Sequence, residues 1–331
     1  MAFPSVSVVM PVRNAEAFLD ESVRSILAQT HDDFELIALD DASSDGSYAR
    51  LAAWAARDRR VRIASSPTPL GPVAASNAVA ALARAPVLAR MDADDRCAPD
   101  RLARQLTLLD ARPDAVLVAC MLEGIDAQGR AIRPRDRWRL VRRSAFAPFP
   151  HGSVMCRRSA FLAIGGYRQA CVYWEDLDLY YRLSAVGRIL VLPDALYQYR
   201  FHVGSVRLVN AEHEVERAID LMTRCLRARC ERGDYEHELD APPGRPAQGS
   251  YHGPLSLALN RMWAGEPLDL RNRLRQRRVW SRSLPLRVAL LAVAGDVSSP
   301  LLRIAMRGLI RARDLAAGRR VGTAPLEWHF A

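Results

Sequence analysis

The chain has 331 residues, of which half are apolar and a quarter are charged. This length suffices for one large or two smaller domains with a buried core, and the composition is ordinary for a globular protein. A fully disordered chain, a collagen and a disulfide-stapled miniprotein are therefore excluded. The net charge is +10, and all 47 basic residues are arginine.

The positive charge is concentrated near the C-terminal end. Residues 1–260 carry 33 arginines and 32 acidic residues, whereas residues 261–331 carry 14 arginines and 5 acidic residues. The charge of the whole chain is therefore no argument for nucleic-acid binding. Coding composition is the simplest reason for the missing lysines, because alanine and arginine are both abundant.

The cysteines and the termini bear on the cellular compartment. The six cysteines form no CxxC pair and have no zinc-ligand spacing. We expect reduced, mostly buried thiols, as in a cytoplasmic protein. The N-terminus lacks a basic segment followed by an apolar run, so we expect no signal peptide. No uncharged apolar stretch reaches the roughly 18 residues of a membrane span.

Residues 5–120 alternate between two hydrophobic periods. The pattern predicts strands at 5–10, 34–39, 61–64, 86–91 and 115–120, and helices at 15–30, 47–56, 73–83 and 99–111. Such alternation predicts an α/β fold with a parallel sheet and helices on both faces. Ligands of these sheets bind beyond the carboxyl ends of the strands. The acidic residues at 40–41 and 92–95 both follow predicted strands, so we expect them at one edge.

The pattern is less regular after residue 120. Residues 121–150 are irregular and rich in arginine. Beyond them the sequence predicts helices at 159–164, 176–185 and 211–231, and strands at 189–192 and 197–201. A stretch rich in Pro, Gly and acids follows. We therefore expect a catalytic domain over 1–230, a linker over 231–254, and a basic helical extension over 255–331.

Three carboxylates, those of Asp92, Asp94 and Asp95, stand within four residues directly after a predicted strand. They repel one another unless a cation lies among them. Oxygen ligands suit Mg²⁺ or Mn²⁺, and such ions often join a few carboxylates to substrate phosphates. The alternative is a solvated acidic turn before the next helix.

A second acidic segment, Asp40 to Ser47, also follows a predicted strand. An Asp at a strand end can accept hydrogen bonds from a ribose hydroxyl or a base N–H. The alternative is a helix cap, which the Asp45-Gly46-Ser47 stretch is well suited to provide.

Two further segments combine aromatic and charged residues. In the first, Trp174 precedes Glu175 and Asp176, and an apolar wall of this kind can tune a carboxylate into a general base. Acids at a helix start are otherwise simple dipole partners. In the second, Arg200 and His202 lie just past a predicted strand, where a structural histidine is the alternative reading.

Together and in this order, these segments resemble the inverting glycosyltransferases of family 2, which have the GT-A fold. The resemblance covers about residues 5–210. It rests on five motifs: the opening strand Val6 to Asn14, the stretch from Ala28 to Asp41, Asp92-Ala93-Asp94-Asp95 as a DxD motif, His151 to Arg158 with Gly165-Gly166-Tyr167, and Glu175-Asp176 with Leu179 and Arg182-Leu183.

The resemblance implies sugar transfer from a nucleotide-diphosphate sugar to an acceptor hydroxyl of a cell-surface polysaccharide or lipid-linked glycan. It implies Asp176 as the catalytic base, with Glu175 as second choice. Mg²⁺ or Mn²⁺ would be held by Asp94, Asp95 and His202. The donor would be bound by Pro11, Arg13, Asn14, Asp40, Asp41, Asn77, Asp92 and Arg200, with Asp41 on the base, Asp92 near the ribose and Arg200 supporting the diphosphate.

The chemistry is coherent, because displacement at an anomeric carbon passes through an oxocarbenium-like state. The leaving diphosphate accumulates negative charge that a metal and an arginine stabilise. Two positions depart from the family pattern. Ala42 stands where the family usually has Gly or Asn, and Ser76 stands where relatives commonly carry Arg.

The basic extension has two readings. Leu301, Leu302, Ala305, Met306 and Leu309 fall on one face of a predicted helix, opposite Arg303, Arg307 and Arg311. This helix either packs on the catalytic domain or rests on an anionic membrane near a lipid-linked acceptor. We therefore expect a cytoplasmic protein, with the inner membrane face as the location if the helix binds lipid.

Two rival functions remain. One is a non-catalytic nucleotide-sugar-binding or scaffold protein on the same fold, against which the retained Asp94, Asp95 and Asp176 argue. The other is nucleic-acid binding through the tail, which has no evident stacking or groove-reading motif. We expect no nucleic-acid partner.

Overall fold

The structure, a computed structural model, describes residues 3–132, 149–202, 221, 224–225, 236–239 and 326–328. Its strands are β1 Val6–Val12, β2 Phe34–Asp41, β3 Val61–Ser66, β4 Val87–Arg90, β5 Arg96–Cys97, β6 Ala115–Ile125, β7 Met155–Arg157, β8 Arg188–Arg200 and β9 Leu326–Trp328. Its α-helices are α1 Leu19–Leu27, α2 Ser47–Arg57, α3 Pro72–Ala81, α4 Arg101–Ala111, α6 Arg158–Ala163, α7 Glu175–Ser184 and α10 Glu236–Leu239. Two 3₁₀ turns, η1 His151–Ser153 and η2 Gln169–Cys171, lie between them.

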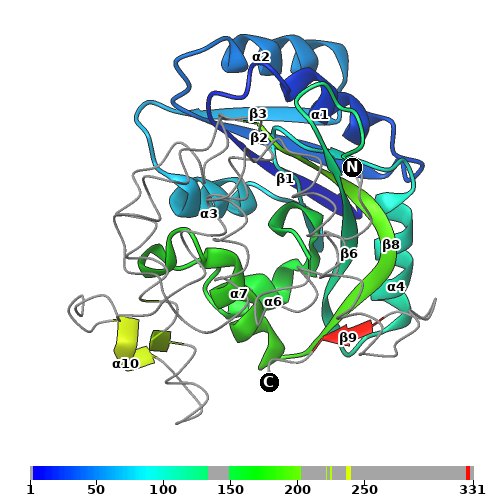
Figure 1. Cartoon of the computed structure of the whole chain (residues 1–331), viewed down its shortest axis with the longest axis vertical. Coiled ribbons are helices and arrows are strands. Elements are labelled where there is room, and N and C mark those ends of the chain that lie inside the picture. The colour runs from blue at the N-terminus through cyan, green and yellow to red at the C-terminus, as the bar shows by residue number, and fades with distance from the viewer. Residues whose placement is uncertain are drawn as a thin grey trace, which may run out of the picture.

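All the described strands join one sheet in the order β3-β2-β1-β4-β7-β6-β8-β5, with β9 paired to β8. Strands β1 to β4 run parallel to one another, and β6 runs parallel to β8. Strand β7 is antiparallel to both β4 and β6. The expected α/β fold with a mixed, mostly parallel sheet is therefore confirmed (Figure 1).

Side-chain alternation along the central strands feeds two cores, one on each face of the sheet. In β1, Val6, Val8 and Met10 face one core, and Val9 faces the other. Helices α1, α2 and α4 cover the first face, and α3, α6 and α7 cover the second (Figure 1). Because successive residues of a strand point to opposite faces, a buried sheet of this kind needs almost continuously apolar strands.

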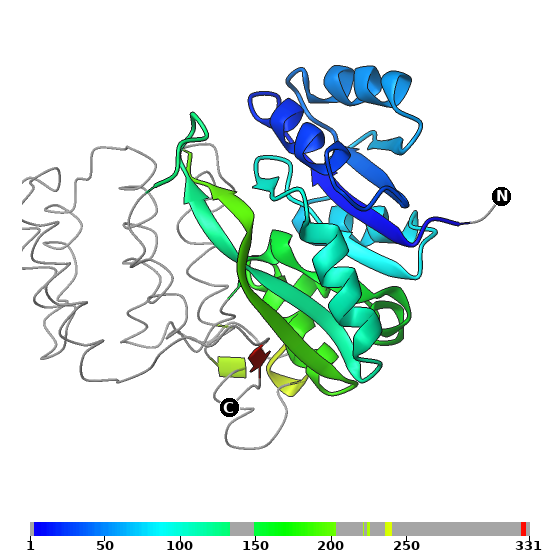
Figure 2. The same ribbon diagram turned by 90° about the vertical axis from the view of Figure 1, so that its right-hand side faces the viewer.

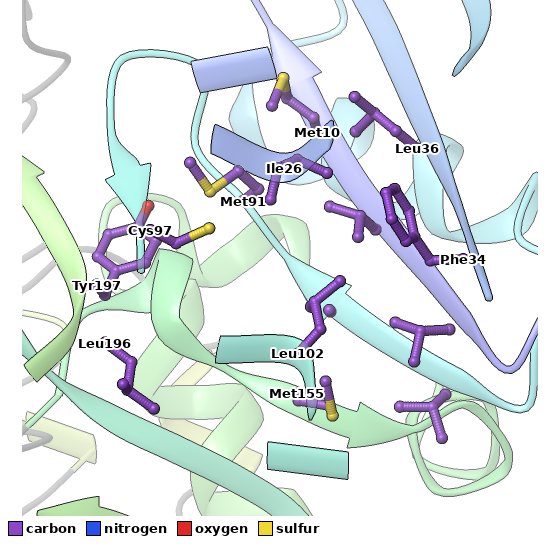
Figure 3. Close-up of a cluster of buried hydrophobic side chains, with 14 of the residues drawn as sticks. Met10, Ile26, Phe34, Leu36, Met91, Cys97, Leu102, Met155, Leu196 and Tyr197 are labelled. Atoms are coloured by element: carbon purple, nitrogen blue, oxygen red, sulfur yellow. The ribbon is translucent and has the colours of Figure 1, made fainter. Parts of the chain in front are cut away.

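The first core includes buried sulfur-containing and aromatic side chains. Met10 and Leu36 from the sheet meet Ile26 of α1, while Leu102 of α4 packs beside Met155 (Figure 3). Burying an aliphatic side chain of this size contributes about 1.5–3 kcal/mol. This packing fixes the strand ends from which the loops of the site begin.

Three features of the sheet differ from the sequence prediction. The two strands predicted at 189–192 and 197–201 form one strand, β8, which runs beside β6 (Figure 2). Its register shifts around Pro193 and Asp194, which lie between the partners of Cys120 and Met121. Pro lacks the N–H of a ladder bond, so the interruption is a bulge rather than a strand end. The short strands β5 and β7 were not predicted.

Several predictions concern residues outside the described ranges. These are most of the helix at 211–231, most of the arginine-rich segment after residue 132, most of the linker at 231–254 and the whole amphipathic helix at 301–311. Within the expected linker, Glu236–Leu239 form the short helix α10. Within the expected helical extension, residues 326–328 form a strand, β9, antiparallel to β8 at Ile189–Val191. In the part of the chain that is described, no helix is both long and apolar enough to cross a bilayer.

Candidate functional site

The carboxyl ends of β1, β2 and β4 lie at one edge of the sheet, because these three strands are adjacent and parallel. The loop after β2 carries the first acidic pair, and the loop after β4 carries the second cluster. The expectation that the two clusters share an edge is therefore met. Strand β8 brings Tyr197, Arg200 and His202 to the second loop, where hydrogen bonds join them to it.

The two aspartates that end β2 have different surroundings. Both oxygens of Asp41 accept backbone N–H groups, Oδ1 from Leu70 at 2.6 Å and Oδ2 from Gly71 at 3.0 Å. Asp40 accepts one bond, from the Ser43 N–H to Oδ2 at 3.2 Å. Its Oδ1 is buried and has no hydrogen-bond partner among the described residues. Because an unsatisfied buried acceptor is costly, Asp40 is better placed than Asp41 to receive an N–H of a ligand.

The loop after β1 is tied to the loop after β2. Arg13 donates through Nη1 to the Asp41 carbonyl at 3.0 Å, and its side chain is 46% exposed. Asn14 has φ +50 and accepts the Ser44 N–H at 2.8 Å on its Oδ1. Pro11, within β1, pairs with Leu39 of β2. Asn14 therefore holds the loop together, and Arg13 remains open to a ligand.

Arg90 and Asp92 form an ion pair at the end of β4. The Nε of Arg90 donates to Asp92 Oδ1 at 3.0 Å, and its Nη1 donates to Ser76 Oγ at 2.7 Å. Burial opposes the charge of Arg90, but Asp92, Tyr167 and Glu175 outweigh it and raise its pKa above the usual value. Asp92 is therefore held by a buried cation.

Asp95 is buried, and both of its carboxylate oxygens are hydrogen-bonded inside the protein. Its Oδ2 accepts the hydroxyl of Tyr197 at 2.7 Å, and its Oδ1 accepts the backbone N–H of Arg200 at 2.6 Å. Burial, followed by the charges of Asp94 and Asp92, raises the pKa of Asp95 well above its usual value. Both carboxylate oxygens of Asp95 therefore accept donors within the protein, and its expected role as a metal ligand remains a prediction.

Asp94 faces His202, with Oδ2 and Nε2 2.9 Å apart. Arg200 lies under this pair and is fully buried. Its Nε donates to the Asp94 carbonyl at 2.7 Å, and its Nη2 donates to Glu21 Oε2 at 2.7 Å. The remaining amino group reaches backbone carbonyls of Asp126 and Ala127. Arg200 therefore ties the loop after β4 to α1 and to the end of β6, and its expected role in supporting the diphosphate remains a prediction.

The donor set suits a hard divalent cation only in part. Among the described residues, no group of three or more His, Cys, Asp or Glu side chains comes together as a metal cluster. Two ligand atoms on an octahedral ion with bonds of about 2.1 Å lie about 3 Å apart, as Asp94 Oδ2 and His202 Nε2 do. Mg²⁺ and its analogues commonly take one or two protein ligands and complete the shell with substrate phosphates. The pair fits such an ion.

The expected base lies at the start of α7. Glu175 and Asp176 occupy its first turn, after the buried Trp174. Asp176 Oδ1 accepts the N–H of Leu177 at 2.8 Å. Tyr173 has φ +71, a strained conformation for a side chain of this size. The strained backbone at Tyr173 and the first turn of α7 together fix the direction in which the side chains of Glu175 and Asp176 leave the backbone.

The segment at 149–167 lies against the acidic loop after β4 and precedes α7 in the chain. His151 Nε2 lies 2.6 Å from the hydroxyl of Tyr167. Asn77 clasps the backbone of Tyr167, donating from Nδ2 to its carbonyl at 2.8 Å and accepting its N–H at 2.9 Å. Asn77 therefore holds the backbone of Tyr167, and its expected contact with the donor remains a prediction. A Cβ at Gly152 would collide with Tyr197 and Asp92, so only glycine allows η1 to approach the acidic loop.

Arg90 and Tyr197 were missed at the sequence level. A charged residue inside the otherwise apolar β4 was a usable signal for Arg90, since buried arginines are rare unless paired. Tyr197 carried no such signal, because a tyrosine in a predicted strand is ordinary.

Comparison with known proteins agrees with this architecture. The family model described as Glycosyl transferase family 2 matches residues 7–166. EpsE of Bacillus subtilis (strain 168), a glycosyltransferase by name, is 30% identical over 239 residues, which cover 70% of this chain and 86% of EpsE. The O-antigen biosynthesis protein RfbC of Myxococcus xanthus is 30% identical over 204 residues, 60% of this chain but 16% of that protein.

A solved structure is similar in fold. The mannosyltransferase PcManGT from Pyrobaculum calidifontis, in complex with GDP-Man and Mn²⁺, superposes with a TM-score of 0.57 at 21% identity, covering 95% of this chain and 87% of that chain. The sheet and this likeness define the GT-A fold. The chain belongs to glycosyltransferase family 2.

Proposed function

We propose that the protein is an inverting, metal-dependent glycosyltransferase that moves a sugar from a nucleotide-diphosphate sugar to an acceptor hydroxyl. The observation that carries the proposal is the acidic edge formed by the loops after β2 and β4, with a further carboxylate at the start of α7. Asp40 has an acceptor oxygen without a partner, Asp94 faces His202 at 2.9 Å, and Asp176 stands at the start of α7.

The donor base would lie over the loops after β1 and β2. Asp40 Oδ1 would accept an N–H from the base, which uracil and guanine both present. The exposed guanidinium of Arg13 and the ring of Pro11 would border the base. Asp92, held by Arg90, would meet the ribose. This assignment replaces Asp41 by Asp40 as the base contact, because Asp41 is engaged by Leu70 and Gly71.

Asp94 and His202 would hold Mg²⁺ or Mn²⁺ against the diphosphate. When bound, such an ion neutralises the charge that develops on the leaving group. The chain's own residues then have two tasks. Arg200 and Asp95 keep the acidic loop in place, and His202 presents its ring nitrogen beside Asp94. The Mn²⁺ of PcManGT agrees with a divalent ion here.

Asp176 would remove the proton of the acceptor hydroxyl as that oxygen attacks the anomeric carbon, and the bond from that carbon to the diphosphate oxygen breaks. A carboxylate within hydrogen-bond reach is what this step requires. Glu175 is the second choice. One base on the face opposite the leaving group leads to inversion without a covalent intermediate. The retained Asp94 and Asp176 argue against the rival of a non-catalytic sugar-nucleotide binder.

The acceptor would be a growing cell-surface polysaccharide or a lipid-linked glycan, and the protein would work in the cytoplasm or at the inner face of the membrane. The similarity to RfbC, an O-antigen biosynthesis protein, supports this class of acceptor. The basic extension at 255–331 would serve either membrane binding or packing against the catalytic domain, and strand β9 supports the second role for its last part.

A thermal-shift screen of nucleotide-diphosphate sugars, with and without Mn²⁺, tests the proposal. A ligand that binds only the folded state stabilises it by about 2.7 kcal/mol at 100 times its Kd. We expect one donor to raise the melting temperature, and to do so only with the metal. No response to any donor would contradict the proposal.

A further inference from the structure

Arg90 is a buried cation between two parts of the proposed site. It contacts Asp92, proposed to meet the ribose, and its charge interacts with Glu175, the neighbour of the proposed catalytic base. Arg90 is the last residue of β4, and its side chain is 11% exposed. Removing a guanidinium from water costs several kcal/mol unless it is paired. A buried arginine at the floor of a binding edge therefore needs a reason beyond packing.

The partners of Arg90 belong to the site. Its Nε donates to Asp92 and its Nη1 donates to Ser76. The ring of Tyr167 lies 5.9 Å from its guanidinium carbon, and Glu175 of α7 acts on its charge. Among the described residues, its Nη2 group has no hydrogen-bond partner. Two N–H donors beside Asp92 thus remain available.

Two other arginines, Arg101 and Arg157, lack this arrangement. Arg101 donates to Gln105 and to the carbonyl of Arg90. Arg157 donates to the carbonyls of Ala115 and Leu109. Their donors tie strands and helices together and reach no carboxylate of the site. Arg90 is distinguished by its pairing with Asp92.

The side chain of Ser76 is small enough to leave room for the guanidinium of Arg90. It is buried in α3, and its hydroxyl donates to the carbonyl of Pro72. The small side chain leaves space that the guanidinium of Arg90 occupies at 2.7 Å. A longer side chain at position 76 would therefore start directly beside the guanidinium of Arg90.

Resting on the proposed function, we propose that Arg90 is a positioning residue for the donor, taking from β4 the place that Ser76 leaves open on α3. It holds Asp92 in the orientation that meets the ribose. Its Nη2 donors match phosphate oxygens, for which guanidinium is the preferred partner. The ligand class is the nucleoside diphosphate of the donor.

An exchange of side chains tests this inference. The probes are UDP, GDP, ADP, CDP and dTDP, each with Mn²⁺, and the readouts are Kd by calorimetry and the melting temperature. Arg90→Ser is expected to weaken binding of the diphosphate that wild type prefers by about 10- to 100-fold, the range of one or two charge-assisted hydrogen bonds. The double variant Arg90→Ser with Ser76→Arg is expected to recover at least tenfold of that loss.

Arg157→Ser is the matched control, because it removes a guanidinium that donates to the backbone carbonyls of Ala115 and Leu109. It is expected to lower the melting temperature and leave Kd unchanged. Binding by Arg90→Ser equal to that of wild type would overturn the inference, as would an exchange variant that folds but recovers nothing. Failure of wild type to bind any of the five diphosphates would instead contradict the proposed function itself.

Discussion

His202 Nε2 lies 2.9 Å from Asp94 Oδ2, and this contact joins the end of β8 to the loop after β4. The ring of His202 also packs 4.5 Å from that of Phe18, which precedes α1. Three separate parts of the chain therefore meet at the place proposed for the cation.

Replacing His202 by Gln tests the metal assignment. Losing one ligand or its orienting partner typically costs 10- to 100-fold in metal affinity, so we expect the Mn²⁺ concentration needed for nucleotide binding to rise by about that factor. His31→Gln, at the opposite edge beside Ser5, is the matched control and leaves the requirement unchanged. An identical Mn²⁺ dependence in His202→Gln would remove His202 from the site.

The neighbouring aspartates of β2 are expected to respond differently. Asp40→Asn replaces an acceptor that has no partner within the protein, so nucleotide affinity falls by about tenfold with little change in stability, as for one hydrogen bond to a charged group. Asp41→Asn loses the acceptor of Leu70 or Gly71 and lowers the free energy of unfolding by about 1–3 kcal/mol. Calorimetry and urea unfolding separate the two. Equal effects of both variants on affinity would contradict the base assignment.

Ala42 follows Asp41 with φ +51, a left-handed conformation. This conformation costs an alanine roughly 1–2 kcal/mol, whereas Asn tolerates it. We expect Ala42→Asn to raise the free energy of unfolding by about 0.5–1 kcal/mol. Ala53→Asn in the exposed face of α2 is the control and is expected to lower it by a few tenths. A lower free energy of unfolding for Ala42→Asn than for wild type in urea would contradict this expectation.

Glu35 predicts a component of the acid sensitivity of the fold. Burial alone would raise its pKa, but hydrogen bonds from Ser7, Arg84 and Arg62 outweigh burial and lower the pKa below its usual 4.5. A carboxyl whose pKa is lowered in the folded state stabilises the fold at pH values above its pKa in the unfolded chain. This contribution is lost as the pH falls through the folded-state pKa.

Urea unfolding between pH 7 and pH 3 checks this expectation. Glu35→Gln is expected to lose about 1–3 kcal/mol near neutral pH, and the gap to wild type should narrow below about pH 4.5. Asp32→Asn, whose carboxylate is nine-tenths exposed, serves as the control with no such narrowing. A constant gap between Glu35→Gln and wild type would show that ionisation of Glu35 contributes nothing.

Much of the fold could be predicted from the sequence, because β1, β2 and β4 are short apolar runs separated by helical periods. The acidic edge followed from strand direction alone. The roles of the individual residues at this acidic edge could not be predicted from the sequence. Asp40 and Asp41 are equivalent in sequence, and only the amides of Leu70 and Gly71 distinguish them.

Asp95 and Arg200 illustrate the same limit. Both are charged residues near the acidic loop, and both were expected to touch the ligand. They bond to each other through the Arg200 backbone N–H, a contact between residues 105 positions apart. No local pattern predicts that contact, because it depends on how β8 meets the loop after β4.

The measurement that tests the central claim most directly compares wild type with Asp176→Asn, using the donor found in the screen with Mn²⁺. Binding of the donor and release of its sugar, to an acceptor or to water, are followed together by calorimetry and by NMR of the anomeric proton. We expect equal donor affinity, an inverted anomer from wild type, and a rate at least about 100-fold lower in Asp176→Asn, as for loss of a general base. Unchanged turnover in Asp176→Asn, or a product that retains the donor configuration, would contradict the account.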